Sequence, residues 1–320
     1  MATSPDGSQP NRVADGPPAF VFMLGTGRCG SSLVHEVLAR HPEVGFVSNL
    51  DDRLAPLGLK GRGNSAIYRC IPPRFTEKGR PRFAPSEAYR SLDRHVSPAI
   101  SVPCRDLTAE DATPWVAARL RRFFEDRARA QGKPVFLHKF TGWPRAGFLS
   151  EVFPEARFVH VVRDGRAVAN SLLQMPWWRG YRGPAEWGWG ELPPDYAREW
   201  QASGRSFAIL AGLEWKLMMD AFELARDGIP PGQWLEMRYE DFVTDPRERT
   251  EDLLRFVGLT WTDAFERGFR QYRFRTTRAA SFYRDLSPAD VDGLTASLAP
   301  HLGRHGYPVV RENAMGDVSS

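Results

Sequence analysis

The feature that most constrains the fold is an apolar segment, a glycine turn and a helix start that follow one another without a break. Ala19–Leu24 is a short apolar run with β-branched and aromatic members, which is typical of a buried strand. The turn Gly25-Thr-Gly-Arg-Cys-Gly30 follows, and Ser31–Arg40 then repeats apolar residues at helical spacing. Turn amides and the helix dipole both favour negative charge. The segment therefore predicts an anion site beyond the end of a buried strand.

The rest of the chain alternates strands with helices. We expect strands at 135–139, 157–163 and 234–238, and helices at 114–131, 146–153, 165–174, 206–226 and 247–257. Strands separated by helices pair in parallel through right-handed crossovers. The predicted class is α/β, with a parallel sheet flanked by helices on both faces. Residues 50–113 are rich in Pro, Gly and Arg and predict loops and short helices over the core.

The length of 320 residues suits one large domain with a full core. We expect a polar N-terminal tail at 1–18, a single domain at 19–310 and a C-terminal tail at 311–320. Residues 175–200 hold five of the ten tryptophans and predict an irregular lid or insertion. These tryptophans form either an aromatic platform for an acceptor or plain packing.

Composition excludes several classes of protein. No run of about 18 apolar residues predicts a membrane span, and the N-terminus lacks the pattern of a signal peptide. The three cysteines are odd in number and widely spaced, which suits a reducing, cytoplasmic setting and no metal site. The net charge is +4, but basic and acidic residues are mixed, so nucleic-acid binding is not expected. The excess of Arg over Lys fits either anion recognition or codon usage.

The glycine turn has the spacing of a Walker phosphate loop but lacks its lysine. Gly25 and Gly30 are correctly spaced, yet Ser31-Ser32 follows where Lys-Ser/Thr is required. Arg28 lies inside the loop instead. Triphosphate chemistry needs that lysine together with a magnesium-binding hydroxyl, whereas a phosphosulfate carries less charge. A glycine turn without any ligand is the alternative.

The segment Phe22–Leu33 resembles the 5′-phosphosulfate loop of sulfotransferases that use 3′-phosphoadenosine-5′-phosphosulfate (PAPS). That loop usually reads Pro-Arg/Lys-Ser-Gly-Thr-Thr; this chain has Gly27, Cys29 and Ser31-Ser32 at the departures. The resemblance implies a P-loop NTPase-like sulfotransferase fold. It also implies a set of residues around the phosphosulfate: Thr26, Gly27, Arg28, Cys29, Gly30, Ser31 and Ser32.

A second motif resembles the same family's clamp for the 3′-phosphate. Arg163 ends a predicted strand, and Ser171 lies two turns into the next helix. A guanidinium with a hydroxyl donor suits a dianionic phosphate, which PAPS carries at this position and ATP does not. The alternative is a surface ion pair between Arg163 and Asp164. Tyr239, in the Arg-Tyr-Glu-Asp segment also common in this family, is a further expected nucleotide contact.

Other segments extend the resemblance from about residue 20 to residue 308. Val135–Lys139 with Phe153–Arg157 is similar to the family's Lys-Thr-Pro strand and the segment that leads to the clamp. Gly303–Pro308 is similar to the usual C-terminal Leu-Gly-x-x-Gly-Tyr. The order and spacing of these motifs are more specific than any one of them.

The resemblance implies that Lys139 and Arg28 stabilise the charge that develops during transfer. A merely solvated lysine is the alternative for Lys139. Many relatives have a glutamate base at the position of Asn49, which cannot take a proton. We therefore expect Asp51 or Asp52 to be the base, or else a helix cap or solvated pair.

Histidine offers no better base in this pattern. Relatives that use a histidine place it where this chain has Thr141. His138 is on the opposite face of the strand from Lys139, which favours a core or supporting role.

The implied activity is sulfuryl transfer from PAPS to a hydroxyl or amine of a small-molecule, lipid or glycan acceptor, without a metal. A P-loop nucleotide kinase and a catalytically silent PAPS-binding module are the competing hypotheses. The sequence specifies neither the acceptor nor the oligomeric state.

Overall fold

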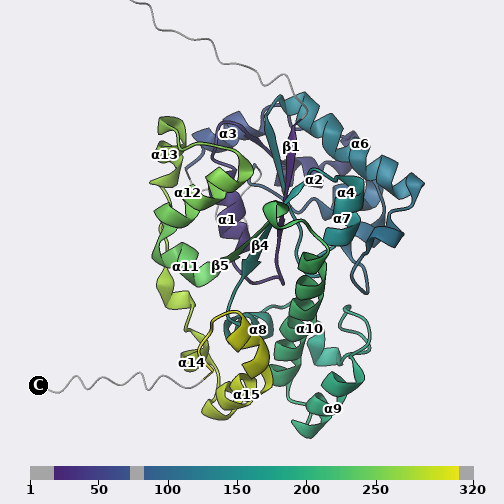
Figure 1. Ribbon diagram of the computed structural model, residues 1–320, viewed down its shortest axis with the longest axis vertical. Coiled ribbons are helices and arrows are strands. Elements are labelled where there is room, and N and C mark those ends of the chain that lie inside the picture. Colours follow the sequence, from purple (N-terminus) through teal and green to yellow (C-terminus); the bar gives the residue numbers. More distant parts are fainter. Residues whose placement is uncertain (1–17, 73–82, 310–320) are drawn as a thin grey trace, which may run out of the picture.

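A computed structural model describes residues 18–72 and 83–309. Its centre is a five-stranded sheet in the order β2-β3-β1-β4-β5, and every pair of neighbouring strands is parallel. The strands are β1 (Ala19–Leu24), β2 (Val44–Gly45), β3 (Val135–Lys139), β4 (Arg157–Val162) and β5 (Trp234–Arg238). The sheet and its flanking helices (Figure 1) confirm the predicted α/β class.

Helices cover both faces of the sheet. Figure 1 shows α1 and α11–α13 on one side and α6, α7 and α10 on the other. The helices and 3-10 turns are α1 (Ser31–Leu38), α2 (Asn49–Arg53), η1 (Ala55–Leu57), α3 (Asn64–Cys70), α4 (Tyr89–His95), α5 (Pro98–Ser101), η3 (Ala109–Asp111), α6 (Pro114–Gln131), α7 (Ala146–Val152), α8 (Gly165–Leu173), η4 (Gly180–Arg182), α9 (Pro194–Ala202), α10 (Phe207–Asp227), η5 (Pro231–Gln233), α11 (Tyr239–Thr244), α12 (Pro246–Val257), α13 (Asp263–Phe269), η6 (Thr276–Arg278), α14 (Phe282–Asp285) and α15 (Pro288–Arg304).

The strand β1 supplies side chains to both cores, because successive residues of a strand point to opposite faces. Phe22 and Leu24 belong to the core under α6, α7 and α10. Val21 and Met23 belong to the core under α1, α12 and α13. An apolar run without polar alternation is therefore explained by burial on both faces.

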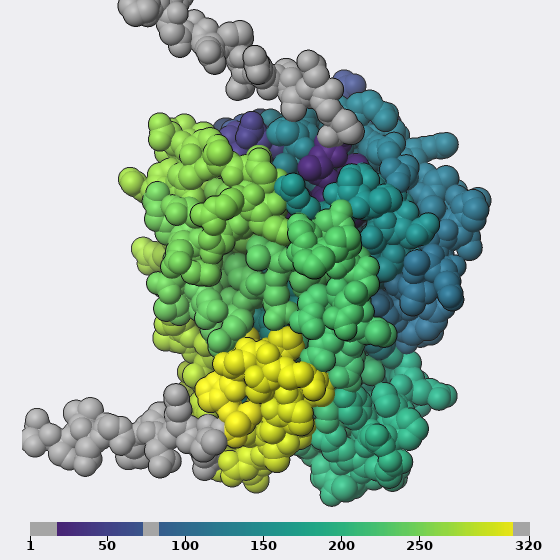
Figure 2. Space-filling view, viewed as in Figure 1, coloured from purple at the N-terminus to yellow at the C-terminus, as the bar shows by residue number. Residues whose placement is uncertain are grey.

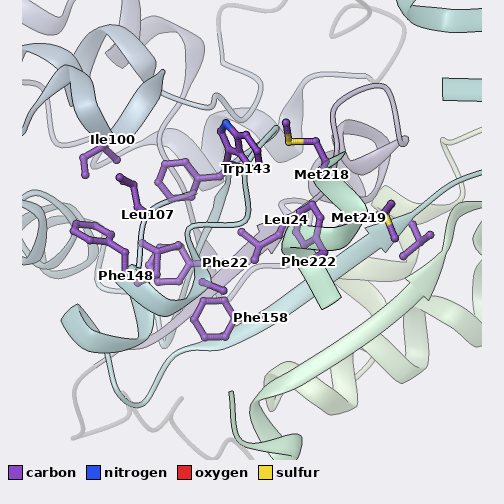
Figure 3. Packing of buried hydrophobic residues seen from close by; sticks show 14 of the residues in the cluster. Phe22, Leu24, Ile100, Leu107, Trp143, Phe148, Phe158, Met218, Met219 and Phe222 are labelled. Atoms are coloured by element: carbon purple, nitrogen blue, oxygen red, sulfur yellow. The ribbon is translucent and has the colours of Figure 1, made fainter. Parts of the chain in front are cut away.

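The first of these cores is mainly aromatic. Figure 3 shows Phe22 and Phe158 close together at its centre. Their ring centroids are 6.0 Å apart, and Phe124 of α6 meets Phe22 edge-on at 5.6 Å. Each fully buried phenylalanine contributes about 1.5–3 kcal/mol through the hydrophobic effect. This packing fixes β1, β4 and α6 relative to one another, and so fixes the loops at the strand ends.

The predicted strands and long helices are present, with small shifts at their ends. The two-residue strand β2 was not predicted, because two residues are too short to show a pattern. Short helices occupy much of the described part of 50–113, as expected. No helix within residues 18–72 and 83–309 is long and apolar enough to cross a membrane.

The domain boundaries stay predictions. The predicted tails fall almost wholly on residues 1–17 and 310–320, outside the described part of the chain. Within the described part, Figure 2 shows α9 and the C-terminal helices α14–α15 side by side at one end of the molecule. α9 and α15 both pack on α10, and α14 packs on α8 and α15.

Candidate anion-binding and catalytic site

The parallel sheet brings the sequence-predicted residues together at one edge. The carboxyl ends of β1, β3, β4 and β5 lead to Gly25, Lys139, Arg163 and Tyr239 respectively. Backbone hydrogen bonds from Phe140 to Met23 (2.9 Å) and from Gly142 to Gly25 (3.0 Å) tie the segment after β3 to the glycine turn. Ligands of open α/β sheets bind at this carboxyl edge.

The glycine turn is held in an unusual backbone conformation. Three of its residues have positive φ angles: Gly27 (77°), Arg28 (55°) and Gly30 (92°). A Cβ on Gly30 would lie 2.2 Å from the ring of Tyr239, so only glycine fits there. Turns of this kind direct successive N–H groups toward one concave side, which binds anions.

The helix α1 begins at the end of this turn and brings two hydroxyls to the site. Its N-cap residue is Gly30, and no side chain of the described residues caps it. The first N–H groups of a helix have no partner within the helix and carry its positive dipole end. Ser31 is buried and Ser32 is exposed at this point. The helix start therefore suits an anionic group.

A lysine is present here, but it comes from another strand. Lys139 Nζ donates to Ser32 Oγ at 2.7 Å and lies 2.6 Å from Glu87 Oε1. Its side chain is only 7% exposed, so Lys139 is not a merely solvated lysine. The cation missing from the Walker pattern is thus supplied by β3.

Arg28 and Arg163 connect the turn to α8. Arg28 Nε donates to Ser171 Oγ at 2.9 Å, which joins the two sequence motifs directly. Arg163 donates to the carbonyl oxygen of Arg28 at 2.9 Å and to that of Arg278 at 2.7 Å. Its guanidinium lies 4.9 Å from the ring centroid of Tyr239, a cation–π arrangement.

These contacts collect positive charge at one place. The pKa of Arg28 is lowered by burial and then by the nearby guanidinium groups of Arg163 and Arg278. The Nε of Arg163 is buried and has no hydrogen-bond partner among the described residues. Positively charged side chains held close together, with a buried N–H donor that has no partner among the described residues, indicate a binding site for an anion.

The alternative ion pair between Arg163 and Asp164 does not form. Asp164 instead pairs with Arg166, with an N–O distance of 2.7 Å, and caps α8 by accepting from the Arg166 backbone N–H. The guanidinium of Arg163 is therefore directed to the candidate site and does not form a surface ion pair with Asp164.

Asp51 and Asp52, the predicted bases, both hold backbone in place. Asp51 Oδ2 accepts from the backbone N–H and hydroxyl of Ser48 and from Asn64 Nδ2, which makes it part of the capping box of α2. Asp52 Oδ1 accepts from the backbone N–H of Ser91 at 2.9 Å. The cap that was the alternative for these residues is thus present, and their role as a base stays an untested prediction.

Three other predicted residues have side chains that point elsewhere. Cys29 is fully buried, with its sulfur packed beneath Gly25, and Thr26 donates to the adjacent carbonyl of Gly27 at 3.2 Å. Both remain candidates through their backbone N–H groups. His138 lies in the aromatic core, where burial lowers its pKa to about 3, so the expected core role fits.

The tryptophan-rich segment is anchored in the core near the site. Trp178 Nε1 donates to the buried carboxyl of Glu214 on α10 at 2.8 Å. A Cβ on Gly142, three residues after Lys139, would lie 2.7 Å from the ring of Trp189. Trp177, in contrast, is 57% exposed. Both packing and an exposed aromatic surface are therefore present in this segment.

A cavity of about 580 Å³ lies between α9, α10 and α15, away from the predicted residues. Small and polar side chains line it, including Ser203, Ser206 and Gly293. None of the predicted site residues takes part in its lining. The cavity is therefore separate from the predicted residues at the strand ends.

Two residues of the site were not predicted from the sequence. Glu87 lies in the irregular Pro-, Gly- and Arg-rich stretch, and Arg278 lies in the 3-10 turn η6. The only sequence signal for Arg278 was the high density of arginine between 267 and 284. Both reach the site through contacts between distant segments.

No metal centre is apparent in the part of the chain that the structure describes. Across residues 18–72 and 83–309, no group of three or more His, Cys, Asp or Glu side chains is arranged to hold an ion. The charges that meet at the strand ends are mainly Lys and Arg, which suit an anionic ligand.

Fold and site together define a class of α/β protein with a phosphate-loop-like turn, no Walker lysine and an arginine clamp at the neighbouring strand. A comparison with protein families matches residues 18–263 to the Sulfotransferase family. The chain belongs to this family.

Its similar proteins include two curated mycobacterial enzymes. Omega-hydroxy-beta-dihydromenaquinone-9 sulfotransferase Stf3 of Mycobacterium bovis is 26% identical over 304 residues, which cover 81% of this chain and 67% of that enzyme. The enzyme of the same name from Mycobacterium tuberculosis matches equally.

Solved structures show the same fold. Sulfotransferase STF9 from Mycobacterium avium aligns with a TM-score of 0.52 and 16% identity, over 92% of this chain and 79% of that one. The sulfotransferase domain from the curacin biosynthetic pathway aligns with a TM-score of 0.51 and 14% identity, over 91% and 98%. The predicted sulfotransferase fold is confirmed.

Proposed function

We propose that this enzyme transfers the sulfuryl group of PAPS to a hydroxyl group of a small, lipid-like acceptor and releases 3′-phosphoadenosine 5′-phosphate (PAP). The observation that carries the proposal is the direct link between two anion sites. Arg28 belongs to the glycine turn, donates to Ser171 on α8 and lies near the guanidinium groups of Arg163 and Arg278. A ligand with phosphate-type groups at both ends of a nucleoside fits two such sites.

Each cation then has a role. The turn amides, Ser31 and Ser32 would hold the 5′-phosphosulfate, and Lys139 would neutralise charge on the oxygens around the transferring sulfur. Arg163 and Ser171 would bind the 3′-phosphate. Tyr239 would keep the turn and the arginine in place, because its ring contacts both. No metal is required in this scheme.

The lipid-like character of the acceptor rests on the curated relatives. Stf3 is named for a hydroxylated dihydromenaquinone, an apolar molecule with a hydroxyl group. Trp189 lies against Gly142, close to the end of β3, and the same segment exposes Trp177. The same sulfuryl transfer would also serve an amine, a glycan or another small alcohol as the acceptor.

We also propose a cytoplasmic location. Cys29, Cys70 and Cys104 are all free thiols, and the latter two are exposed, which suits a reducing compartment.

The test is calorimetric titration of the purified protein with PAP and, separately, with ATP plus magnesium. We expect PAP to bind without metal and much more tightly than ATP. Arg163→Ala should weaken PAP binding at least tenfold, about 1.4 kcal/mol, because the variant loses a charged donor to a dianion. Arg129→Ala, an exposed arginine on α6, is the matched control and should bind PAP like the unmodified protein.

Three results would contradict the proposal. Failure to bind PAP would remove the PAPS site, and tighter magnesium-dependent binding of ATP would favour the nucleotide kinase. A protein that binds PAP, yet never releases it from PAPS with water or any acceptor, would be the silent binding module.

A further inference from the structure

We propose that Glu87 is a catalytic residue of this site, the general base that takes the proton from the acceptor hydroxyl. The inference rests on the proposed sulfuryl transfer. It adds a residue and a proton path, neither of which the sequence motifs contain.

The backbone places Glu87 firmly at the site. The segment before it pairs with the segment before α2, through an isolated antiparallel bridge between Ser48 and Pro85. Hydrogen bonds from Asn49 N to Ala84 O (2.9 Å) and from Ser86 N to Val47 O (2.8 Å) extend this pairing. Glu87 follows directly, just before α4 begins. A carboxylate on paired backbone is held more precisely than one on a free loop.

The carboxylate is then oriented by contacts from β3 and the residues after it. Lys139 Nζ lies 2.6 Å from Oε1, and the Thr141 hydroxyl donates to Oε2 at 3.1 Å. The Tyr89 hydroxyl lies 3.1 Å from that of Thr141 and completes the network. Burial raises the pKa of Glu87, but the charge of Lys139 and these hydrogen bonds outweigh it, so the pKa lies below its ordinary value. The carboxylate is ionised, as a base must be.

Glu87 is also adjacent to the donor side of the site. A single ammonium group, that of Lys139, lies between its carboxylate and the hydroxyl of Ser32 on the phosphosulfate loop. A quarter of the Glu87 side chain is exposed, so an acceptor can reach it. Asp51 and Asp52 each use one carboxylate oxygen to hold backbone: Asp51 Oδ2 accepts from Ser48 N–H and Asp52 Oδ1 from Ser91 N–H.

Glu36 is another carboxyl group near Lys139 in the described part of the chain, and it is a competitor for this role. Burial raises its pKa to about 7, partly offset by the charges of Lys139 and Arg40. Its position on α1 places it beside the buried Arg40, whose guanidinium lies against Tyr68. Glu87 is favoured because its carboxylate directly contacts both Lys139 and Thr141.

The proposed step balances as follows. The acceptor oxygen forms a bond to sulfur, while the bond from sulfur to the bridging oxygen of PAPS breaks and its electron pair leaves with PAP. The hydroxyl proton passes to Glu87 and then to solvent. As negative charge develops on the sulfuryl oxygens, Lys139 exchanges part of its pairing with Glu87 for pairing with those oxygens. The base therefore gains proton affinity during transfer.

The experiment measures release of PAP from PAPS by Glu87→Gln, with water as the acceptor and with farnesol as a lipid-like alcohol. We expect the rate with either acceptor to fall at least 100-fold, the scale of a lost general base. PAP binding by calorimetry should stay within about threefold of the unmodified protein, because Glu87 is not a phosphate contact. Glu87→Asp should restore part of the rate.

The pH dependence separates a base from a structural residue. The pH profile of kcat/KM reports groups of the free enzyme, and Glu36 near Lys139 has a pKa of about 7, so the profile is measured with Glu36 replaced by Gln. With Glu87 ionised, this background should be flat from about pH 5 to pH 8. When Glu87→Gln is added to it, the proton must leave to solvent, so the rate should rise with hydroxide concentration. Glu36→Gln alone is therefore the matched control.

The outcomes are distinguishable. If the unmodified protein fails to bind PAP, the proposed function fails. If it binds PAP and turns over PAPS, but Glu87→Gln is equally fast or keeps a flat profile, the assignment of Glu87 is overturned. A rate that depends on Glu36 rather than Glu87 overturns it too. Loss of rate with intact PAP binding and a new pH slope supports it.

Discussion

Glu214 is an acidic side chain in the interior of the protein. It is 2% exposed on α10 and accepts an indole N–H from Trp178. Burial raises its pKa to about 7, although hydrogen bonds from Trp178 and Trp189 act in the opposite direction. The unfolded chain would release this proton near the ordinary glutamate value of about 4.5. The folded protein therefore holds a proton that the unfolded chain loses first.

This difference predicts a stability loss with rising pH. A raised folded-state pKa leaves stability intact below about pH 4.5 and removes it as the pH rises through about 7. The loss from this group amounts to ~3 kcal/mol above that range. Glu214→Gln keeps an acceptor for the indoles but cannot ionise, so it should be more stable than the unmodified protein at pH 8 and similar at pH 5.

Urea unfolding at pH 5, 6, 7 and 8 measures this effect as the difference between the two proteins. Taking the difference removes the contributions of other titrating groups. A difference that does not change with pH would show that Glu214 titrates normally in the fold.

Asp51 is a buried acidic residue that caps the short helix α2. Its carboxylate accepts from Ser48 and Asn64 in a buried capping box. Asp51→Ala leaves those donors without a partner and should cost about 1–3 kcal/mol of stability. Turnover per folded molecule should change less than threefold. Thermal unfolding and PAP release measure the two effects; a stable but inactive variant would restore Asp51 as the base.

At the scale of elements, the glycine turn offers a matched pair of substitutions. Gly27 and Gly30 both have positive φ angles, but a Cβ meets nothing within 4 Å at Gly27 and lies 2.2 Å from Tyr239 at Gly30. Gly27→Ala should therefore cost only backbone strain, about 1–2 kcal/mol. Gly30→Ala should in addition displace the ring of Tyr239, against which the guanidinium of Arg163 lies.

Calorimetry with PAP separates the two variants. We expect Gly30→Ala to weaken PAP binding at least tenfold more than Gly27→Ala, with circular dichroism confirming that both are folded. Equal affinities would mean that the position of Tyr239 does not matter to the nucleotide site.

The elements themselves could largely be predicted from the sequence, because local patterns determine them. The helix α6 begins at Pro114 and ends before Gly132, where proline at N1 and glycine after the C-terminus are expected. Buried strands were visible as apolar runs. The Arg28–Ser171 contact was not predicted, because 143 residues separate the two side chains.

Glu87 shows what local patterns cannot supply. It reaches Thr141 across 54 residues, through pairing of two irregular segments that no periodicity marks. Asp51 and Asp52 looked better placed, because they lie immediately beyond Asn49, where many relatives have a glutamate. Asp51 instead accepts from a backbone N–H at the start of its own helix α2, and Asp52 from the N–H of Ser91 in the first turn of α4. These N–H groups need partners only once the helices form.

On the scale of the whole molecule, the two motifs draw on segments from the entire chain. The turn after β1, the end of β3, the start of α8 and η6 meet at one edge of the sheet. Burial, and then the charges of Arg163 and Arg278, lower the pKa of Arg28, as expected where like charges are held together. Binding energy of an anion can therefore stabilise contacts between the N-terminal and C-terminal thirds of the fold.

This arrangement predicts that PAP raises the thermal stability of the whole protein. At 100 times its dissociation constant, a ligand that binds only the folded state stabilises it by about 2.7 kcal/mol. For a chain of this size that corresponds to a rise in Tm of about 4 °C. The rise should persist in EDTA, should be smaller in Arg163→Ala at the same PAP concentration, and should exceed that given by ATP with magnesium. Differential scanning calorimetry measures each case. A Tm that responds to ATP and magnesium but not to PAP would mean that the arginine cluster recognises a triphosphate. The reason is that only a ligand whose charges match both anion sites can relieve the repulsion among Arg28, Arg163 and Arg278.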